Sequence, residues 1–330
     1  MKTLLSRLRP DSFTLALVAT VVLASLLPAR GVAVAPLGVV THGAIALLFF
    51  LHGARLSRHA LLEGAAHWRL HLVVLASTFV LFPVLGLLLR QTLAGWVDPS
   101  LLLGLLFLCL LPSTVQSSIA FTSLAGGNVA AAVCGASASN LLGVFLTPLL
   151  VGLLIGDGGA GGRHSLEAVG RIFAELFVPF LAGHLLRPWI GAWVERHRPL
   201  LGLVDRGSIL LVVYMAFSEA VVHGLWARLG WRELGVLGVL SGLLLAVVLG
   251  ATVGASRALG FSREDEITIV FCGSKKSLAS GVPMASVLFP PAIVGTVVLP
   301  LMVFHQLQLM VCAGLARRYA RRGPARRAEE

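Results

Sequence analysis

Ten long apolar runs, separated by short polar segments, dominate the sequence. A helix that crosses a membrane needs about 20 mostly apolar residues, and each run is close to this length. The runs therefore predict ten transmembrane helices, numbered here as spans 1 to 10. They cover residues 12–29, 37–54, 70–90, 100–124, 128–154, 168–188, 207–224, 234–256, 266–288 and 292–316. The first run resembles a signal peptide but is interpreted as a retained span, because its loss would leave an odd number.

The composition agrees with an all-α polytopic membrane protein. Of 330 residues, 57% are apolar and 12% are charged, and the mean hydropathy is +0.91. A soluble domain carries about 25% charged residues, so the soluble class is excluded. The four cysteines, Cys109, Cys134, Cys272 and Cys312, lie in apolar runs without a close-spaced pair. They are interpreted as small core residues and not as disulfides or metal ligands. No cofactor is expected.

The net charge of +11 is unevenly placed along the chain. With the N-terminus inside, the predicted inside segments carry 18 Lys and Arg residues and the outside segments carry 6. This bias predicts that both termini are cytoplasmic. The basic tail at 317–330 is expected to lie beside anionic membrane lipid, and nucleic acid is not an expected partner. Short loops and many Arg, Ala and Gly residues suit a bacterial inner (plasma) membrane.

Ten spans divide into two sets of five around a predicted loop at Arg196–Arg206. The first repeat, spans 1–5, lies within residues 1–195, a range that also takes in the start of span 6 and the loop after it. The second repeat, spans 6–10, covers residues 168–330. An odd number of spans in each repeat gives the halves opposite orientations, which is the inverted-repeat plan of many secondary transporters.

Polar residues interrupt the fourth span in each half. In span 4 the interruption is Leu111–Ser118, and in span 9 it is Gly273–Ser277. Interrupted helices at matching positions indicate the binding site of a transporter. A helix break exposes free N–H groups on one half-helix and free carbonyls on the other, so it offers ends that bind anions and cations.

Lys275 and Lys276 stand side by side in the second interruption, and the chain has only one other lysine. An ammonium group inside a membrane costs at least ~2.5–3.5 kcal/mol on insertion scales, so a functional role is favoured. The alternative is that one lysine extends to the interface as an ordinary anchor. A desolvated lysine can also release its proton, which leaves proton coupling open.

Other polar residues in the spans are weaker candidates. Hydroxyl and amide groups after Pro112 either contact a ligand or satisfy the backbone of a kinked helix. Asn128 is expected to cap the fifth helix, and the patch around Asn140 either lines the site or joins helices. The predicted substrate- and ion-binding residues are Gln116, Ser117, Ser118, Asn128, Ser137, Asn140, Ser274, Lys275, Lys276 and Ser277.

Two intramembrane carboxylates, Glu175 and Glu219, are candidates to face a cleft or pair with an arginine. The charged run Arg263–Glu266 is interpreted as a solvated loop and helix N-terminus.

Four sequence segments carry a resemblance to a known family. They are Pro112–Ser118, Gly127–Ala130, Leu146–Leu150 and Gly273–Met284. In these segments the chain resembles the bile acid:sodium symporter superfamily, and most closely its SBF-like membrane transporter branch. The resemblance implies a panel domain from spans 1, 2, 6 and 7 and a core domain from spans 3–5 and 8–10. It also implies that discontinuous helices 4 and 9 cross in the core, with sodium at the crossing and an organic anion in the cleft.

The ninth helix departs from the pattern of the sodium-coupled members. When the sequences are aligned on Gly273, the family's carboxylate falls on Phe271, and its Gln-Asn pair falls on Lys275 and Lys276. An oxygen ligand is therefore lost and two positive charges are gained. We expect Lys276 to replace the bound cation and the other lysine to face the cavity and attract an anion.

The fourth and fifth helices depart as well. Four and eight residues after Asn128, where those members have Ser and Thr, this chain has Ala132 and Ala136. The family's Ser-Asn pair becomes Ser117–Ser118. Sodium needs several oxygen ligands, so these losses make ordinary sodium binding doubtful.

The sequence thus predicts a secondary transporter of a small organic anion that works by alternating access. Two alternatives are a sodium- or proton-coupled symporter with a modified ion site and a membrane regulator that does not transport. A remote third is a Ser–Lys hydrolase, but adjacent helical residues do not face each other, and the break in span 4 would stay unexplained. The substrate, the coupling ion and the oligomeric state are left open.

Overall fold

The computed structural model describes residues 12–55, 67–155 and 166–321, and every named element in these ranges is a helix. Within these ranges, six helices are long and apolar enough to cross a membrane. They are Gly31–Arg55, Trp68–Thr92, Val129–Leu154, Arg198–Val222, Trp231–Ala258 and Pro291–Arg321. The protein is therefore an all-α polytopic membrane protein.

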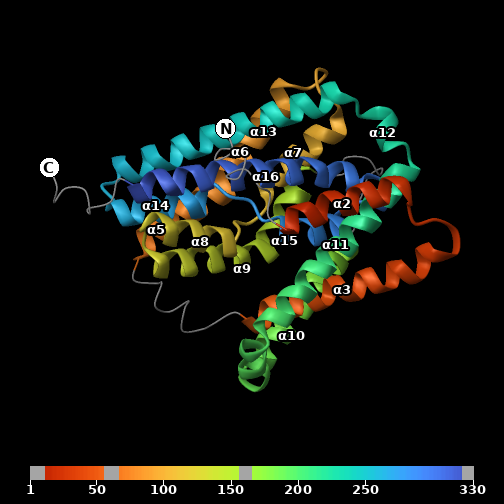
Figure 1. Cartoon of the computed structure of the whole chain (residues 1–330), viewed down its shortest axis with the longest axis horizontal. Helices are drawn as coiled ribbons and strands as arrows, with labels where there is room; N and C mark the ends of the chain where they lie inside the picture. Colours follow the sequence, from red (N-terminus) through yellow and green to blue (C-terminus); the bar gives the residue numbers. More distant parts are fainter. Residues whose placement is uncertain (1–11, 56–66, 156–165, 322–330) are drawn as a thin grey trace. The chain divides into compact units, whose positions relative to one another are not determined.

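Each expected span overlaps at least one helix (Figure 1). In chain order the helices are α2 (Ser12–Leu26), η1 (Gly31–Ala33), α3 (Val34–Arg55), α5 (Trp68–Ala76), η3 (Ser77–Leu81), α6 (Phe82–Thr92), α7 (Pro99–Leu110), α8 (Gln116–Ala125), α9 (Val129–Leu154), α10 (Leu166–Arg196), α11 (Arg198–Val222), α12 (Leu225–Arg228), α13 (Trp231–Ala258), α14 (Arg263–Gly273), α15 (Leu278–Leu288) and α16 (Pro291–Arg321). That ten of these segments cross the membrane stays a prediction.

The predicted loop at residues 196–206 is wrong, because this segment is helical. Helix α10 ends at Arg196 and α11 begins at Arg198, so the two helices meet at a tight turn. Pro199 lies in the first turn of α11, where a missing N–H costs nothing. Asp205, which follows within α11, forms an ion pair with Arg55 at the end of α3. The helix therefore extends beyond its apolar run because its polar residues have partners.

The chain divides into two compact units, and each draws on both halves of the sequence. Unit 1 comprises the described parts of Met1–Leu56, Asp157–Arg232 and Gly281–Leu299, and unit 2 comprises those of Ser57–Gly156, Glu233–Ser280 and Pro300–Glu330. Spans 1, 2, 6 and 7 fall in unit 1, and spans 3, 4, 5 and 8 fall in unit 2. Helices α15 and α16 are divided between the units.

In unit 1, α3 packs along α10, and α11 packs against α2 and α3. Two glycines allow the backbones of α3 and α10 to touch. A Cβ atom on Gly53 would clash with the carbonyl oxygen of Phe180, and a Cβ atom on Gly183 would clash with that of Phe50. Small residues at such contacts are typical of helix pairs in membranes, where close van der Waals packing replaces the hydrophobic effect.

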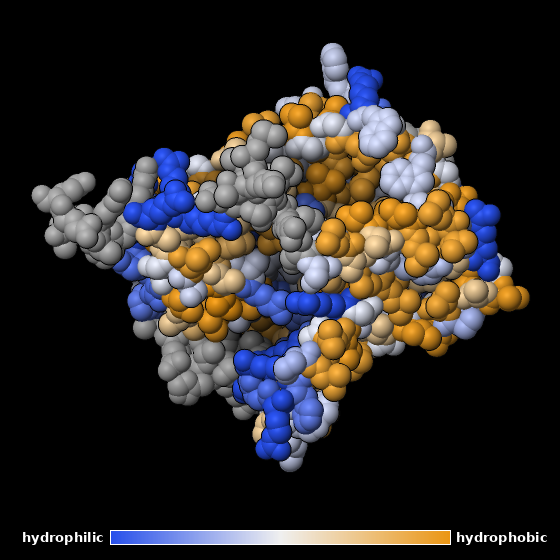
Figure 2. All heavy atoms as spheres, in the orientation of Figure 1, coloured by the Kyte–Doolittle hydropathy of each residue, from blue (hydrophilic) through white to orange (hydrophobic). Residues whose placement is uncertain are grey.

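Both units expose large apolar side chains, as expected for surfaces that face lipid. Figure 2 shows such side chains over much of the visible face. Val39 in unit 1 is 74% exposed, and Leu153 and Val239 in unit 2 are 74% and 71% exposed. Exposed apolar surface of this kind is unfavourable in water and favourable in a bilayer.

In unit 2, α14 packs against α5, α8 and α9. A buried apolar cluster joins α5, α9 and α14, and it includes Val74, Ala132, Ala136 and Cys272. The two alanines therefore lie in apolar surroundings, at the positions where the resemblance places oxygen ligands for sodium.

The helix that contains α5 and α6 changes register at η3, a π-helical stretch. Here the N–H of Phe82 donates to the carbonyl of Ser77, five residues earlier. In the same register the next donor, residue 83, would serve the carbonyl of Thr78. Residue 83 is proline and has no N–H, so the Thr78 carbonyl is left without a donor from its own helix.

Candidate ion and solute site at two helix breaks

The two polar interruptions are breaks in the helices, and the breaks touch each other. Residues 111–115 separate α7 from α8, and residues 274–277 separate α14 from α15. The N–H of Ser277 donates to the carbonyl of Pro112 at 2.9 Å. The hydroxyl of Ser113 donates to the carbonyl of Cys272 at 2.5 Å. Backbone away from a helix at membrane depth needs such partners, because lipid supplies none.

Serine hydroxyls satisfy the carbonyls at the C-terminal end of α14. In addition to the bond from Ser113, Ser118 donates to the carbonyl of Phe271 at 2.9 Å. Ser77 donates to the carbonyl of Gly273 at 2.8 Å. The last carbonyls of a helix have no partner within it, so these neutral donors complete the end of α14.

The corresponding end of α7 is completed by a cation. Lys276 Nζ donates to the carbonyls of Thr78, Cys109 and Leu111 at 2.8, 2.9 and 2.6 Å. An ammonium group has three N–H donors, so all of them are used. The side chain is fully buried, and Nζ lies 4.1 Å from the ring centroid of Phe82. The partial negative charge of a helix C-terminus and the aromatic face both favour a positive charge here.

Lys275 is equally buried but has fewer polar partners. Its Nζ donates to the carbonyl of Ser117 at 2.8 Å. Nζ also lies 4.0 Å from the ring centroid of Phe121 and 5.5 Å from that of Phe271. Its exposed fraction is 0%, so in this conformation Lys275 does not reach open space, in contrast to the expectation that it faces a cavity.

Asn140 on α9 connects the first break to the first turn of α15. Its Nδ2 donates to the carbonyl of Ser113 at 2.6 Å, and its Oδ1 accepts the hydroxyl of Ser280 at 2.9 Å. Farther along α9, Thr147 donates to the carbonyl of Leu110 at 2.8 Å. Helix α9 therefore holds the first break, the first turn of α15 and the end of α7 by direct hydrogen bonds.

The residues beside Asn140 contribute unequally. Ser139 Oγ accepts the N–H of Ser113 at 3.0 Å. A Cβ atom on Gly143 would lie 2.6 Å from Pro112, so only glycine permits this contact between α9 and the first break. The hydroxyl of Ser137 makes no hydrogen bond with any residue that the structure describes.

The remaining predicted residues near the breaks are held by their neighbours. Ser274 donates to the carbonyl of Val270 at 2.5 Å, and Ser277 donates to Ser280 at 3.1 Å. Neither serine hydroxyl is hydrogen-bonded to a lysine in the described part of the chain. The Ser–Lys dyad of a hydrolase is thus not formed there. Gln116, the first residue of α8, is exposed.

Asn128 lies away from the breaks, at the other end of α14. Its side chain accepts the N–H of Ala131 at 3.0 Å and caps α9, as the sequence predicts. Its Nδ2 donates to Asp265 at 3.0 Å. Asn128 thus joins the N-terminal ends of two helices.

The two carboxylate candidates belong to unit 1. Glu175 on α10 is exposed. Glu219 on α11 lies 3.7 Å from His223, one helical turn later. Neither carboxylate forms an ion pair with an arginine in the part of unit 1 that the structure describes.

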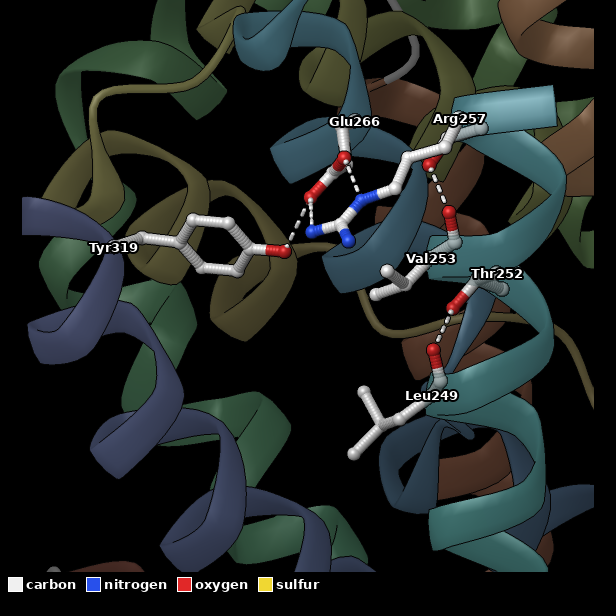
Figure 3. A network of polar contacts seen from close by, with 7 residues as sticks. Leu249, Thr252, Val253, Arg257, Glu266 and Tyr319 are labelled. Atoms are coloured by element: carbon white, nitrogen blue, oxygen red, sulfur yellow. Dashed lines mark hydrogen bonds and ion pairs between the residues drawn. The ribbon is translucent and has the colours of Figure 1, made fainter. Parts of the chain in front are cut away.

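The charged run before α14 is more ordered than a solvated loop. Ser262 caps the helix by accepting the N–H of Asp265, but Glu266 is buried, with 8% exposed. Figure 3 shows its carboxylate between Arg257 on α13 and Tyr319 on α16, with contacts of 2.9 and 2.8 Å. Burial is tolerated because both carboxylate oxygens are hydrogen-bonded.

Gln308 on α16 is part of the site, although it is not among the residues predicted from the sequence. Its Oε1 accepts the N–H of Lys276 at 2.9 Å, and its Nε2 donates to the carbonyl of Lys276 at 2.9 Å. The side chain is fully buried. The only signal in the sequence is a pair of uncharged amides, Gln306 and Gln308, in the middle of the last apolar run.

Comparison with known proteins relates this chain to a family of membrane transporters. Residues 11–321 match the family described as the SBF-like CPA transporter family. The chain is 63% identical over 316 residues to an uncharacterized protein of Pseudomonas aeruginosa, covering 96% of this chain and 95% of that protein. It is 60% identical over 311 residues to YfeH of Escherichia coli, named as a candidate symporter, with 94% and 93% covered. It is 29% identical over 314 residues to sodium/bile acid cotransporter 7 of Rattus norvegicus, with 93% and 92% covered.

Proposed function

Because the chain belongs to the SBF-like CPA transporter family, we propose that it is a secondary transporter of a small organic anion. The proposal includes ten spans in two inverted repeats, a core and a panel that alternate access, and a bacterial inner membrane location. The site lies where the α7–α8 break meets the α14–α15 break. One observation carries the proposal: the ammonium of Lys276 occupies the carbonyl-lined end of α7.

Lys276 takes the place of a bound cation in this proposal. Backbone carbonyl oxygens are ligands that a sodium ion also uses, and here two at the end of α7 and one in η3 bind one ammonium. Charge-assisted hydrogen bonds offset the cost of burying this charge. The surroundings favour a covalently attached cation over a free one, since Ala132, Ala136 and Phe271 supply no side-chain oxygen.

Lys275 is the proposed contact for the anion. Its ammonium makes one hydrogen bond within the described residues, so two N–H directions remain for other acceptors. Ser117, whose carbonyl accepts this bond from Lys275, lies in the first turn of α8. The N-terminus of α8 has no side-chain cap, so its free N–H groups offer a second anion-binding element. A carboxylate of the solute would reach both when the conformation changes and the site opens.

A sodium-coupled symporter is the second candidate. The names of the vertebrate relatives state sodium and bile acid as what those proteins transport. In this chain Thr114 Oγ1 lies 2.7 Å from Ser117 Oγ and 3.1 Å from Ser118 Oγ. These three hydroxyls form a close oxygen cluster at the first break, which is the observation that favours this candidate.

Thermal unfolding of the purified protein in detergent separates these two candidates. Sodium is titrated against choline at constant ionic strength, with Ser117→Ala as the matched variant. A ligand that binds only the folded state must raise the unfolding midpoint. We expect no rise that is specific to sodium. A sodium-specific rise that disappears in Ser117→Ala would contradict the replacement of sodium by Lys276.

Uptake into proteoliposomes that contain only this protein tests transport itself. The probes are taurocholate and a panel of short mono- and dicarboxylates, each measured in sodium and in choline. We expect saturable uptake of at least one probe in choline, and loss of that uptake in Lys275→Met. If no probe enters while the protein is folded, the non-transporting regulator is favoured.

A further inference from the structure

The backbone of Lys276 has lost both of its ordinary helical partners. In a continuous helix its N–H would donate to the carbonyl of Cys272, but that carbonyl accepts the hydroxyl of Ser113. Its carbonyl would accept the N–H of Ser280, but that N–H donates to Ser277 Oγ at 3.2 Å. The peptide groups on either side of the lysine are therefore left to an external partner.

Gln308 is that partner, and its amide matches both groups at once. Oε1 accepts the Lys276 N–H and Nε2 donates to the Lys276 carbonyl, each at 2.9 Å. A backbone N–H is always a donor, so the amide can bind in only one orientation. The second Nε2 hydrogen points to His305 Nδ1 at 2.9 Å, one turn earlier on α16. This contact fixes the amide further.

The position of the Lys276 backbone decides where its ammonium lies. The side chain has four rotatable bonds, and ordering them costs conformational entropy. All three acceptors of Nζ belong to other segments, two at the end of α7 and one in η3. A backbone held at two atoms limits the region that Nζ can reach, so its three bonds can form together.

We propose that Gln308 is a positioning residue, which acts through the backbone of Lys276 to keep the ammonium at the end of α7. This inference rests on the proposed role of Lys276 as the attached cation. Glutamine suits the task because one side chain must both accept and donate. Neither methionine, which has the same length, nor glutamate in its ionised form can do both.

Reductive methylation of the lysines by formaldehyde and cyanoborohydride, read by mass spectrometry, tests the proposal. The full-length protein in detergent is compared with Gln308→Met, which keeps most of the side-chain volume. Gln308→Glu, which keeps an acceptor but loses the N–H donors, is the second variant. The matched control is Gln306→Ala, because Gln306 lies two positions away on the same helix. Lys275, which is equally buried, is the internal reference.

Loss of two hydrogen bonds should raise the methylation rate of Lys276 about tenfold in Gln308→Met, with Lys275 changed by less than about twofold. Gln308→Glu should behave like Gln308→Met, and Gln306→Ala like the wild type. If Gln308 were only part of the packing, both lysines would change together, and this result would overturn the inference. An unchanged rate at Lys276 in both Gln308 variants would also overturn it.

The same measurement separates this inference from the proposed function. If Lys276 in the wild-type protein is methylated as fast as in the denatured chain, the ammonium is not held by the carbonyls. The proposed cation replacement then fails, and the positioning role fails with it. If Lys276 is protected in the wild type and in every variant, only the role of Gln308 fails.

Discussion

At the residue scale, the ammonium of Lys276 binds three carbonyls that two local features leave without helical donors. Pro83 removes the N–H that would serve Thr78, and the end of α7 leaves Cys109 and Leu111 without helical donors. Each release alone would leave a buried carbonyl without a hydrogen bond, at a cost of about 1–3 kcal/mol. One lysine side chain satisfies all three carbonyls. Its contribution to stability therefore depends on the features of η3 and α7 that leave these carbonyls without other donors.

Lys276→Ala should therefore lower the thermal unfolding midpoint strongly, because three buried carbonyls lose their partner at about 1–3 kcal/mol each. Methylammonium, which is small and keeps three N–H donors, should restore part of the loss. Tetramethylammonium, which has none, should not. The matched variant Lys275→Ala should not respond to methylammonium to the same degree, since its ammonium has one carbonyl partner. If methylammonium and tetramethylammonium stabilised Lys276→Ala equally, the rescue would be a general salt effect.

Asn140→Ala should cost about 1–3 kcal/mol of unfolding free energy, because the carbonyl of Ser113 and the hydroxyl of Ser280 both lose a buried partner. Ser137→Ala, three residues earlier on the same helix, should stay within about 0.5 kcal/mol of the wild type. Thermal unfolding of both variants in the same detergent checks this. Similar losses in both would mean that α9 tolerates no change here, whatever its hydrogen bonds.

At the element scale, contacts between helices depend on a few positions where the fit is closest. Gly53 and Gly183 let the backbones of α3 and α10 meet in unit 1. Glu266 joins α13, α14 and α16 in unit 2 (Figure 3). Substitutions at these positions should differ in their effect on stability. The glycines limit how closely two helices can approach, whereas Glu266 makes polar contacts with its neighbours.

Gly183→Ala should separate α3 from α10, since its methyl group would overlap the carbonyl of Phe50. Overpacking of this kind costs about 1–3 kcal/mol and occasionally more. Gly202→Ala is the control, because nothing lies within 4 Å of its Cβ position. In a helix this change should raise stability by up to about 1 kcal/mol. Size-exclusion profiles after heating compare the two, and equal stability would contradict the close contact.

Tyr319→Phe should cost about 1 kcal/mol, since it leaves the buried Glu266 without one of its hydrogen bonds. Arg257→Gln should cost less, because the arginine side chain is 67% exposed and exposed ion pairs add little. Glu264→Gln, on the exposed side of the same turn, should be neutral. The measurement is the order of the three thermal unfolding midpoints. A lower midpoint for Arg257→Gln than for Tyr319→Phe would contradict this prediction.

At the scale of the whole molecule, apolar runs were enough to predict an all-α membrane protein, and polar residues inside them predicted both breaks. The partners of the lysines could not be predicted, because every residue has a carbonyl and only the fold selects three of them. Gln308 was missed for a similar reason, since 32 residues separate it from Lys276. The false loop at 196–206 arose because an apolar run marks where lipid ends, and a helix can continue past that point.

The orientation of the chain in the membrane is a further prediction at this scale. A fluorescent protein fused after Glu330 should mature, whereas alkaline phosphatase fused there should be inactive, because the positive-inside rule places this end in the cytoplasm. A phosphatase fused after Gly95, in the turn between α6 and α7, should be active. The reverse pattern of activities would show that the chain has the opposite orientation in the membrane.

The attachment of the proposed cation to the chain has a consequence for energy conversion. A sodium ion that enters on one side and leaves on the other brings the free energy of its gradient to the solute. The ammonium of Lys276 is covalently bound and fully buried, so it cannot leave with the solute. Unless a proton is exchanged, such a carrier can only equalise the electrochemical potential of its solute across the membrane. At steady state, cells that express it would then take up the anion only as fast as metabolism removes it.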